Sequence, residues 1–169
     1  MKARAFGFTA AAIIFLAEQV SKWWITGPLQ LQTVRQIELL PIFNFTWTEN
    51  YGISLGLFQA TSDTMRWALV AITSAIAVGV AVWIGKEKER ADQLALGMVL
   101  GGALGNIVDR TRYGYVVDFL DLHFGTFRPF YVFNVADAAI SIGVAILILR
   151  AFIAWLGERK DGQESEDHA

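Results

Sequence analysis

Four long apolar stretches constrain this chain more than any other feature of its sequence. A membrane-spanning helix needs about 20 consecutive, mainly apolar residues. Apolar residues make up 54% of the 169 residues and charged residues 18%, whereas soluble domains average about 25% charged residues. The sequence therefore predicts an α-helical membrane protein with four transmembrane helices, at about 6–25, 67–84, 92–108 and 135–156.

The composition excludes several classes of site. The chain has no cysteine, which removes disulfides, thiolate metal sites and cysteine nucleophiles. Its only histidines are His123 and His168, so a multi-histidine metal centre is excluded. A net charge of -2 gives no basic field for nucleic acid. We therefore expect no metal, no cofactor and no nucleic-acid partner.

The basic residues predict how the spans are oriented. Lysine and arginine gather in cytoplasmic loops. Here they lie before the first span, between the second and third spans, and after the fourth: Lys2, Arg4, Lys86, Lys88, Arg90, Arg159 and Lys160. The long segment 27–65 holds only Arg35. We expect both termini in the cytoplasm, with segments 27–65 and 109–134 on the extracytoplasmic side.

The chain reads as one domain. No low-complexity linker interrupts it, so residues 1–156 form a single membrane-embedded domain. The first span ends in Glu-Gln-Val-Ser-Lys-Trp-Trp, which is not a small-residue cleavage site, and this predicts an uncleaved span. The polar tail 157–169 is predicted to be disordered.

The outer segments carry signals of a small extracytoplasmic β-sheet. Apolar and polar residues alternate over 42–48, which predicts a half-buried strand. Residues 118–124 alternate in the same way. The aromatic face of this sheet, with Phe45 and Trp47, is expected to rest on the outer leaflet or to cradle a substrate. Residues 53–58 fit either another strand or a short interfacial helix.

Glycine and polar residues of the first and third spans suggest how the helices meet. Gly97, Gly101 and Gly105 recur every four residues, a pattern that lets a neighbouring backbone approach closely. Glu18 and Lys22 lie four residues apart on one helix face and predict an ion pair.

Polar residues also gather at the outer end of the third span. Asn106, Asp109 and Arg110 are spaced so that they form one polar face if the helix continues. Ionisable groups at such positions are costly unless paired and usually mark function.

Two aspartates are the candidate reacting groups. Asp118 lies in the second outer segment and Asp137 at the outer end of the fourth span. The third and fourth spans are consecutive and antiparallel, so their outer ends lie close and the carboxyl groups can converge. Such a pair shares one proton, which leaves one acid and one base. These two groups are sufficient to hydrolyse an amide with water and without a metal.

Two other functions compete with a peptidase. In a proton-coupled transporter the aspartates are relay groups, but polar residues would then be expected along a path across the membrane. A noncatalytic membrane assembly factor would use the glycine face and the outer sheet. The polar cluster lies at one side of the membrane only, which favours the peptidase.

Five short motifs make the chain resemble the lipoprotein signal peptidase (signal peptidase II) family of bacterial intramembrane aspartic proteases. The resemblance runs from about residue 15 to residue 140. Its motifs are Glu-Gln-Val-Ser-Lys at 18–22, Glu-Asn-Tyr-Gly at 49–52, Gly-Gly-Ala-Leu-Gly-Asn-Ile-Val-Asp-Arg at 101–110, Val-Val-Asp-Phe at 116–119 and Phe-Asn-Val-Ala-Asp at 133–137.

The resemblance implies an activity and a set of roles. It implies removal of the signal peptide from diacylglyceryl-modified prolipoproteins, by cleavage before the lipidated cysteine, with Asp118 and Asp137 as the catalytic pair. Substrate binding or support of the pair falls to Asn50, Asn106, Arg110 and Asn134. Structural support falls to Glu18, Lys22 and Asp109.

The resemblance also implies a location and partners. The expected location is the bacterial inner membrane, with the active site near the extracytoplasmic face. The implied partners are lipidated prolipoproteins, membrane lipid and globomycin-type inhibitors. Two positions depart from the family pattern: Glu18 stands where Asp is usual, and the residues after Asn50 read Ile-Ser-Leu-Gly-Leu-Phe at 53–58.

Overall fold

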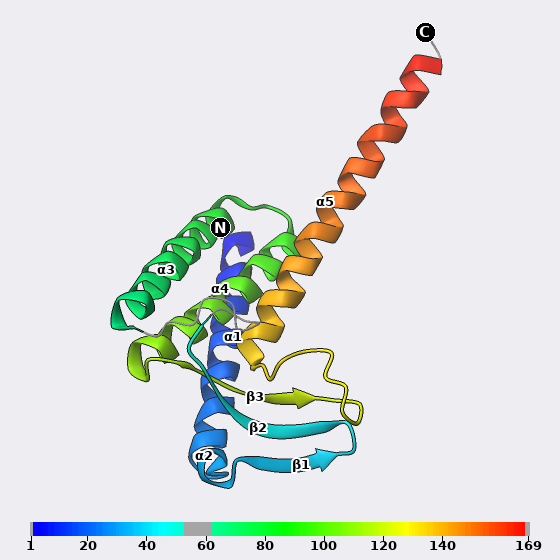
Figure 1. The fold of residues 1–169 in the computed structure, drawn as a ribbon. Helices are drawn as coiled ribbons and strands as arrows, with labels where there is room; N and C mark the ends of the chain where they lie inside the picture. Colours follow the sequence, from blue (N-terminus) through cyan, green and yellow to red (C-terminus); the bar gives the residue numbers. More distant parts are fainter. Residues whose placement is uncertain (1, 53–61, 168–169) are drawn as a thin grey trace.

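The computed structural model describes residues 2–52 and 62–167. It contains four long helices and a small antiparallel sheet (Figure 1). The helices are α1 (Lys2–Thr26), the short α2 (Leu31–Val34), α3 (Asp63–Lys86), α4 (Arg90–Arg112) and α5 (Val135–Asp167). The strands are β1 (Gln36–Leu40), β2 (Phe43–Asn50) and β3 (Val116–Leu122).

The predicted fold class is confirmed. Each long helix contains a segment that is long and apolar enough to cross a membrane: Ala5–Thr26, Asp63–Lys86, Arg90–Arg112 and Val135–Gly157. The sheet has the order β1-β2-β3 with antiparallel pairing throughout. The sequence did not predict β1 or α2.

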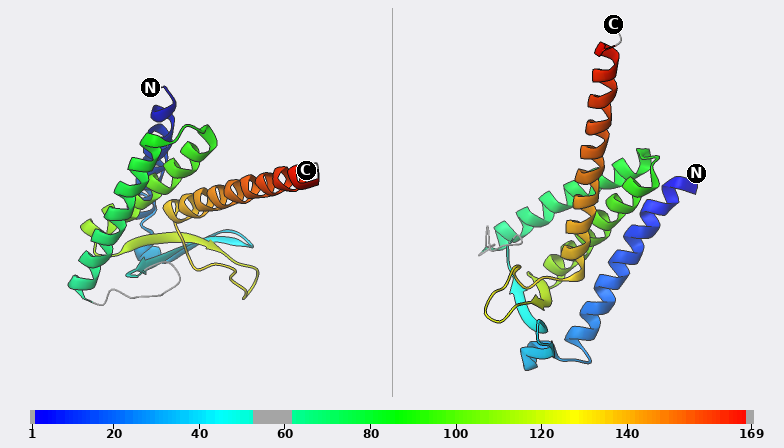
Figure 2. Two further views of the ribbon diagram at one scale, coloured as in Figure 1. Left: turned by 90° about the horizontal axis from the view of Figure 1, so that it is seen from above. Right: turned by 90° about the vertical axis from the view of Figure 1, so that its right-hand side faces the viewer.

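Helix α4 lies at the centre of the bundle and packs against α1, α3 and α5 (Figure 2). Glycines allow two of these contacts. A methyl group on Gly97 or Gly101 would meet the backbone carbonyl oxygen of Gly7 or Ala11 in α1. On the other side of α4, a methyl group on Gly102 would lie 2.6 Å from the carbonyl oxygen of Ala136 in α5. The predicted packing role of the glycine row is confirmed.

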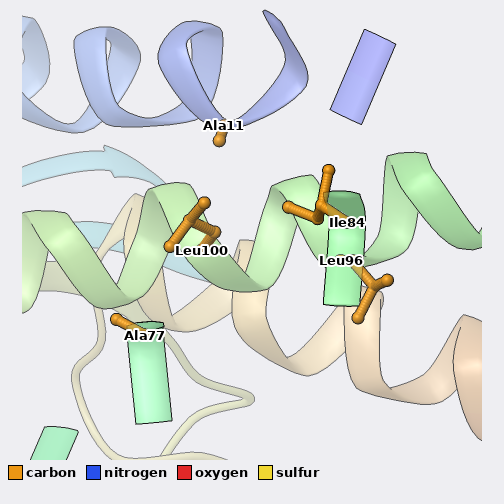
Figure 3. Close-up of a cluster of buried hydrophobic side chains, with 5 residues drawn as sticks. All are labelled: Ala11, Ala77, Ile84, Leu96 and Leu100. Atoms are coloured by element: carbon orange, nitrogen blue, oxygen red, sulfur yellow. The ribbon is translucent and has the colours of Figure 1, made fainter. Parts of the chain in front are cut away.

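Small and branched apolar side chains fill the space where α1, α3 and α4 meet (Figure 3). The buried members of this cluster are Ala11, Ala77, Ile84, Leu96 and Leu100. Large apolar side chains also remain exposed along the outer faces of the helices, including Ile13, Ile72 and Ile148. Such outward-facing apolar surfaces are expected where lipid, rather than water, surrounds the helices.

The sheet lies across one end of the bundle and has its own core. Trp47 of β2 is buried together with Ile25, Leu31, Val117 and Phe119, so this side chain packs between the sheet, the end of α1 and α2. The expectation that the aromatic face containing Trp47 meets lipid or substrate is therefore wrong for Trp47. An irregularity in the β2–β3 pairing between Phe45 and Thr48 also interrupts the simple alternation that the sequence suggested.

Predictions were also made for the C-terminal tail and for residues 53–58. The polar tail was expected to be disordered from residue 157, whereas α5 continues as a helix to Asp167 and projects from the bundle (Figures 1 and 2). The tail lacks proline and contains several good helix formers, so intrinsic propensity favours this continuation. The expected element at 53–58 lies outside the described residues, as does His168.

We predict that Gly101→Ala destabilises the bundle, because the new methyl group would collide with the α1 backbone. Overpacking of this kind costs about 1–3 kcal/mol. The matched control is Gly79→Ala in α3, where an added methyl group meets nothing within 4 Å. Thermal unfolding in detergent should show a clear loss of stability for Gly101→Ala but not for Gly79→Ala. Equal stability of the two variants would contradict this packing.

Candidate active site

Polar side chains gather where the C-terminal end of α4, strand β3 and the start of α5 meet. Most of these side chains are shielded from solvent although they are charged or carry amide groups. The buried members of this cluster are Glu18, Lys22, Asn106, Asp109, Arg110, Asp118 and Asn134. Asp137 is half-buried beside them. All eight are candidate site residues from the sequence, so the fold brings together groups that are far apart along the chain.

One asparagine connects the two candidate aspartates. The Nδ2 of Asn134 donates a hydrogen bond of 2.7 Å to Oδ1 of Asp118. The Oδ1 of the same side chain accepts a bond of 2.8 Å from the backbone N–H of Asp137. Asn134 directly precedes α5, so its side chain caps the first turn of the helix that carries Asp137. This single amide therefore fixes β3 and α5 relative to each other at the aspartate pair.

Two more asparagines complete the hydrogen bonding of the pair. Asn50, the last residue of β2, donates to Oδ2 of Asp118 at 3.0 Å. Asn106 of α4 donates to Oδ1 of Asp137 at 3.0 Å, and its own Oδ1 accepts from Asn134 at 3.2 Å. Each carboxyl group is thus held by an amide donor from a different element. These donors are neutral amide groups, which do not act as nucleophiles.

Burial strongly perturbs Asp118. Burial, together with the negative charge of Asp137, raises the pKa of Asp118 from its ordinary 3.8 to about 7. Hydrogen bonds from Asn50 and Asn134, together with the charge of Lys22, oppose this increase in pKa without cancelling it. A carboxyl group of this kind retains a proton near neutral pH beside an ionised partner.

Arg110 joins α4 to the residues that follow β2. Its Nη2 donates to the backbone carbonyl oxygen of Gly52 at 2.6 Å, and its guanidinium is buried. The side chain of Asn50 accepts a hydrogen bond of 3.0 Å from the backbone N–H of Gly52. Gly52 is therefore fixed at both backbone polar groups, which holds the end of β2 against the candidate site.

A buried ion-pair network lies on the α1 side of the cluster. Lys22 contacts Glu18 on the same helix face, as the sequence predicted, and its Nζ lies 2.5 Å from Oδ2 of Asp109 in α4. Asp109 also accepts a bond of 3.0 Å from the backbone N–H of Val117. Glu18 accepts a bond of 3.1 Å from the backbone N–H of Ala136.

This network acts on the residues that precede both aspartates. Val117 precedes Asp118 and Ala136 precedes Asp137. Gly105 provides the space that Glu18 occupies, because a methyl group there would lie 2.8 Å from Cγ of Glu18. One cation in α1 thus holds two carboxylates, and these carboxylates fix the backbone beside the pair.

Asn106, Asp109 and Arg110 were expected to form one polar face if the helix continues. Helix α4 does continue to Arg112, and all three side chains are buried in the polar cluster. They bond to different partners: Asn106 to Asp137, Asp109 to Lys22 and Arg110 to Gly52. The last two contacts could not be predicted from the sequence, because one partner is distant in sequence and the other is a backbone carbonyl group.

A second buried aspartate lies outside this cluster. Asp121 of β3 is fully buried, and it accepts hydrogen bonds from Thr46 at 2.9 Å and from Nε of Arg128 at 3.0 Å. These bonds, with Arg128 and Thr46 donating, hold the pKa of Asp121 below its usual value although burial alone would raise it. His123, which the sequence analysis left out of the site, follows this strand. Within residues 2–52 and 62–167 the structure contains no cluster of three histidine or acidic side chains suited to a metal ion.

Comparisons with known proteins give matches that cover most of the chain. A family model described as Signal peptidase (SPase) II matches residues 10–153. The lipoprotein signal peptidase of Sphingopyxis alaskensis is 56% identical over 154 residues, which cover 91% of this chain and 88% of that protein. The protein of the same name from Rhizorhabdus wittichii is 57% identical over 150 residues, covering 89% and 87%.

The fold also resembles a solved structure. A bacterial membrane enzyme determined by the in meso method at 2.3 Å resolution superposes with a TM-score of 0.74 at 27% sequence identity. The match covers 86% of this chain and 87% of that one. The bundle and sheet described above therefore occur together in an experimentally solved membrane enzyme.

We predict that Lys22→Met strongly destabilises the protein, because it leaves Glu18 and Asp109 buried without their shared cation. Removing one partner from a buried ion pair costs about 3–5 kcal/mol. The control is Arg150→Met, which removes the partly exposed pair of Arg150 with Asp92 and should cost about 0–1 kcal/mol. Thermal unfolding measures the loss of stability in both variants. If Lys22→Met loses no more stability than Arg150→Met, the ion-pair network does not hold the fold together.

Proposed function

The chain belongs to the signal peptidase (SPase) II family, and on that basis we propose that it removes the signal peptides of lipid-modified prolipoproteins with an aspartate pair and water. Membership of this family makes the chain a protease of lipoprotein processing. The proposed substrate is a prolipoprotein that carries a diacylglyceryl group on a cysteine. The bond cleaved is the peptide bond that precedes this cysteine.

The proposed catalytic groups are Asp118 and Asp137. The observation that carries this assignment is the link through Asn134, which hydrogen-bonds to the carboxyl group of Asp118 and to the backbone of Asp137. The increased pKa of Asp118 supports the same assignment, since a pair that shares one proton supplies both an acid and a base. The two groups then titrate as a unit.

The reaction follows general acid–base chemistry. The ionised carboxylate takes a proton from water, and the water oxygen forms a bond to the carbonyl carbon of the scissile peptide. The protonated carboxyl group of the pair donates its proton as the C–N bond breaks, so the leaving nitrogen of the lipidated cysteine becomes an amine. No covalent intermediate with the protein is needed.

The amide and guanidinium groups around the pair have supporting roles in this proposal. Asn50, Asn106 and Asn134 orient the carboxyl groups through the bonds already described. Arg110 holds the end of β2 at Gly52 and brings positive charge close to the substrate backbone. Glu18, Lys22 and Asp109 support the backbone on which Asp118 and Asp137 lie.

The membrane supplies much of the substrate positioning. We propose that residues 1–156 are a single domain of the bacterial inner membrane, with both termini in the cytoplasm. Segments 27–65 and 109–134, and with them the aspartate pair, then lie at the extracytoplasmic face. The acyl chains of the substrate stay in the bilayer, which keeps the scissile bond at this level and reduces the entropy cost of binding. Globomycin is proposed to inhibit the protein by occupying the same site.

We predict that Asp118→Asn and Asp137→Asn each reduce cleavage of a diacylglyceryl-modified prolipoprotein by about 100-fold or more. Both substitutions keep the size of the side chain but remove its ability to exchange a proton. The measurement is kcat/KM of purified protein in lipid bilayers.

Asp121→Asn is the matched control for this experiment. Asp121 is another buried aspartate of β3, but its hydrogen bonds go to Thr46 and Arg128. Its variant should retain cleavage within a few-fold of the parent. Full cleavage by a folded Asp118→Asn or Asp137→Asn variant would remove that residue from the chemistry. The peptidase would then use groups other than this pair.

We predict that cleavage declines as the pH rises above about 7, where Asp118 gives up the proton that the pair shares. Its pKa is raised on folding, so the proton is held more tightly in the folded than in the unfolded chain. The contribution of this group to stability therefore also decreases between about pH 4 and pH 7. A profile of kcat/KM from pH 5 to pH 9, with folding checked at each point, tests this decline. A rate that stays constant between pH 6 and pH 9 would contradict the raised pKa.

A further inference from the structure

Six large apolar side chains are exposed at one end of the sheet. Leu40 and Ile42 lie at the turn between β1 and β2, and the other four lie in the loop between β3 and α5. Figure 1 places that turn and that loop at the same end of the sheet. We call this group the apolar tip: Leu40, Ile42, Phe124, Phe127, Phe130 and Tyr131, each between 44% and 68% exposed.

The backbone holds the apolar tip in an ordered arrangement. The backbone N–H of His123 donates to the carbonyl oxygen of Ile42 at 3.0 Å, which joins the loop to the turn. Phe124 and Phe127 exchange two backbone hydrogen bonds of 2.8 and 3.2 Å. Gly125 between them has a φ of +63°, a conformation that glycine adopts without strain. The aromatic side chains are thus exposed on a structured turn.

The apolar tip is tethered close to the membrane boundary. Tyr131 precedes Val135, the first residue of a candidate membrane span, by four residues. Four extended residues reach at most about 14 Å, and the polar headgroup region on each side of a bilayer is about 5–7 Å thick. The loop therefore ends within reach of the headgroups.

The charge of the loop suits a lipid surface. Residues 123–134 contain no aspartate or glutamate. Arg128 is half exposed, with one side of its guanidinium held by the buried Asp121. A cation beside exposed aromatic rings is the combination that anchors proteins at the boundary between lipid tails and phosphate headgroups.

We propose that the apolar tip inserts into the outer leaflet of the membrane and is an attachment point separate from the four spans. The loop leads directly into α5, which contains a candidate membrane span, and this favours lipid over another protein as the occupant. Insertion at this point would fix the height of the sheet above the bilayer. Since β3 carries Asp118, the attachment would also fix the level of the proposed reacting group. The inference needs the orientation proposed above but none of the chemistry.

The absence of cysteine from the chain makes a direct test possible. Phe127→Cys and Phe130→Cys are each labelled with the environment-sensitive dye NBD. The proteins are placed in vesicles of phosphatidylethanolamine and phosphatidylglycerol that contain lipids spin-labelled near the headgroup. The control is Gln32→Cys, an exposed position on α2. We expect blue-shifted emission and at least twofold stronger quenching at 127 and 130 than at 32.

Two results would overturn the proposal. One is quenching at both tip positions that is no stronger than at position 32. The other is a change of emission that occurs only after a lipidated prolipoprotein is added, which would assign the surface to substrate. The experiment measures no cleavage, so its outcome is separate from that of the aspartate variants.

Discussion

The half of this structure that carries the sheet depends on pairing the charge of one buried lysine. Lys22 lies in an apolar helix, and a cation there is tolerated only when carboxylates neutralise it. Glu18 and Asp109 provide that charge. Because each carboxylate also accepts a backbone N–H, from Ala136 or from Val117, the pairing of one charge ties α1 to α4, β3 and α5. The need to neutralise Lys22 thereby connects the packing of the helices to the geometry of the candidate site.

Close helix packing makes this pairing possible. Gly101 and Gly102 let the backbone of α4 touch α1 on one side and α5 on the other. Gly105 gives Glu18 the space to reach α5. Without these small residues the helices would stand further apart, and side chains as short as Asn106 and Asp137 would no longer meet. The same glycines that pack the bundle therefore also set the geometry of the proposed site.

The hydrogen bonds to the proposed reacting pair come from neutral amide side chains. Asp118 accepts bonds from neutral amides, Asn50 and Asn134, whereas Asp121 on the same strand is paired with Arg128. Two buried aspartates three residues apart thus have opposite properties: the pKa of Asp118 is raised and that of Asp121 is lowered. The identity of their partners, rather than burial alone, separates a group suited to proton transfer from one suited to holding a loop.

The sequence by itself determined the four spans, because hydropathy and length are local properties that the bilayer selects directly. It also predicted the Glu18–Lys22 contact, since residues four apart share a helix face, and it predicted the strand that became β2. Only the tertiary structure decided that Asp109 completes this pair, that Trp47 faces a core, and that Asn134 links Asp118 to Asp137. Those contacts join elements distant in sequence, and the direction of each side chain is set by how the helices and the sheet pack together.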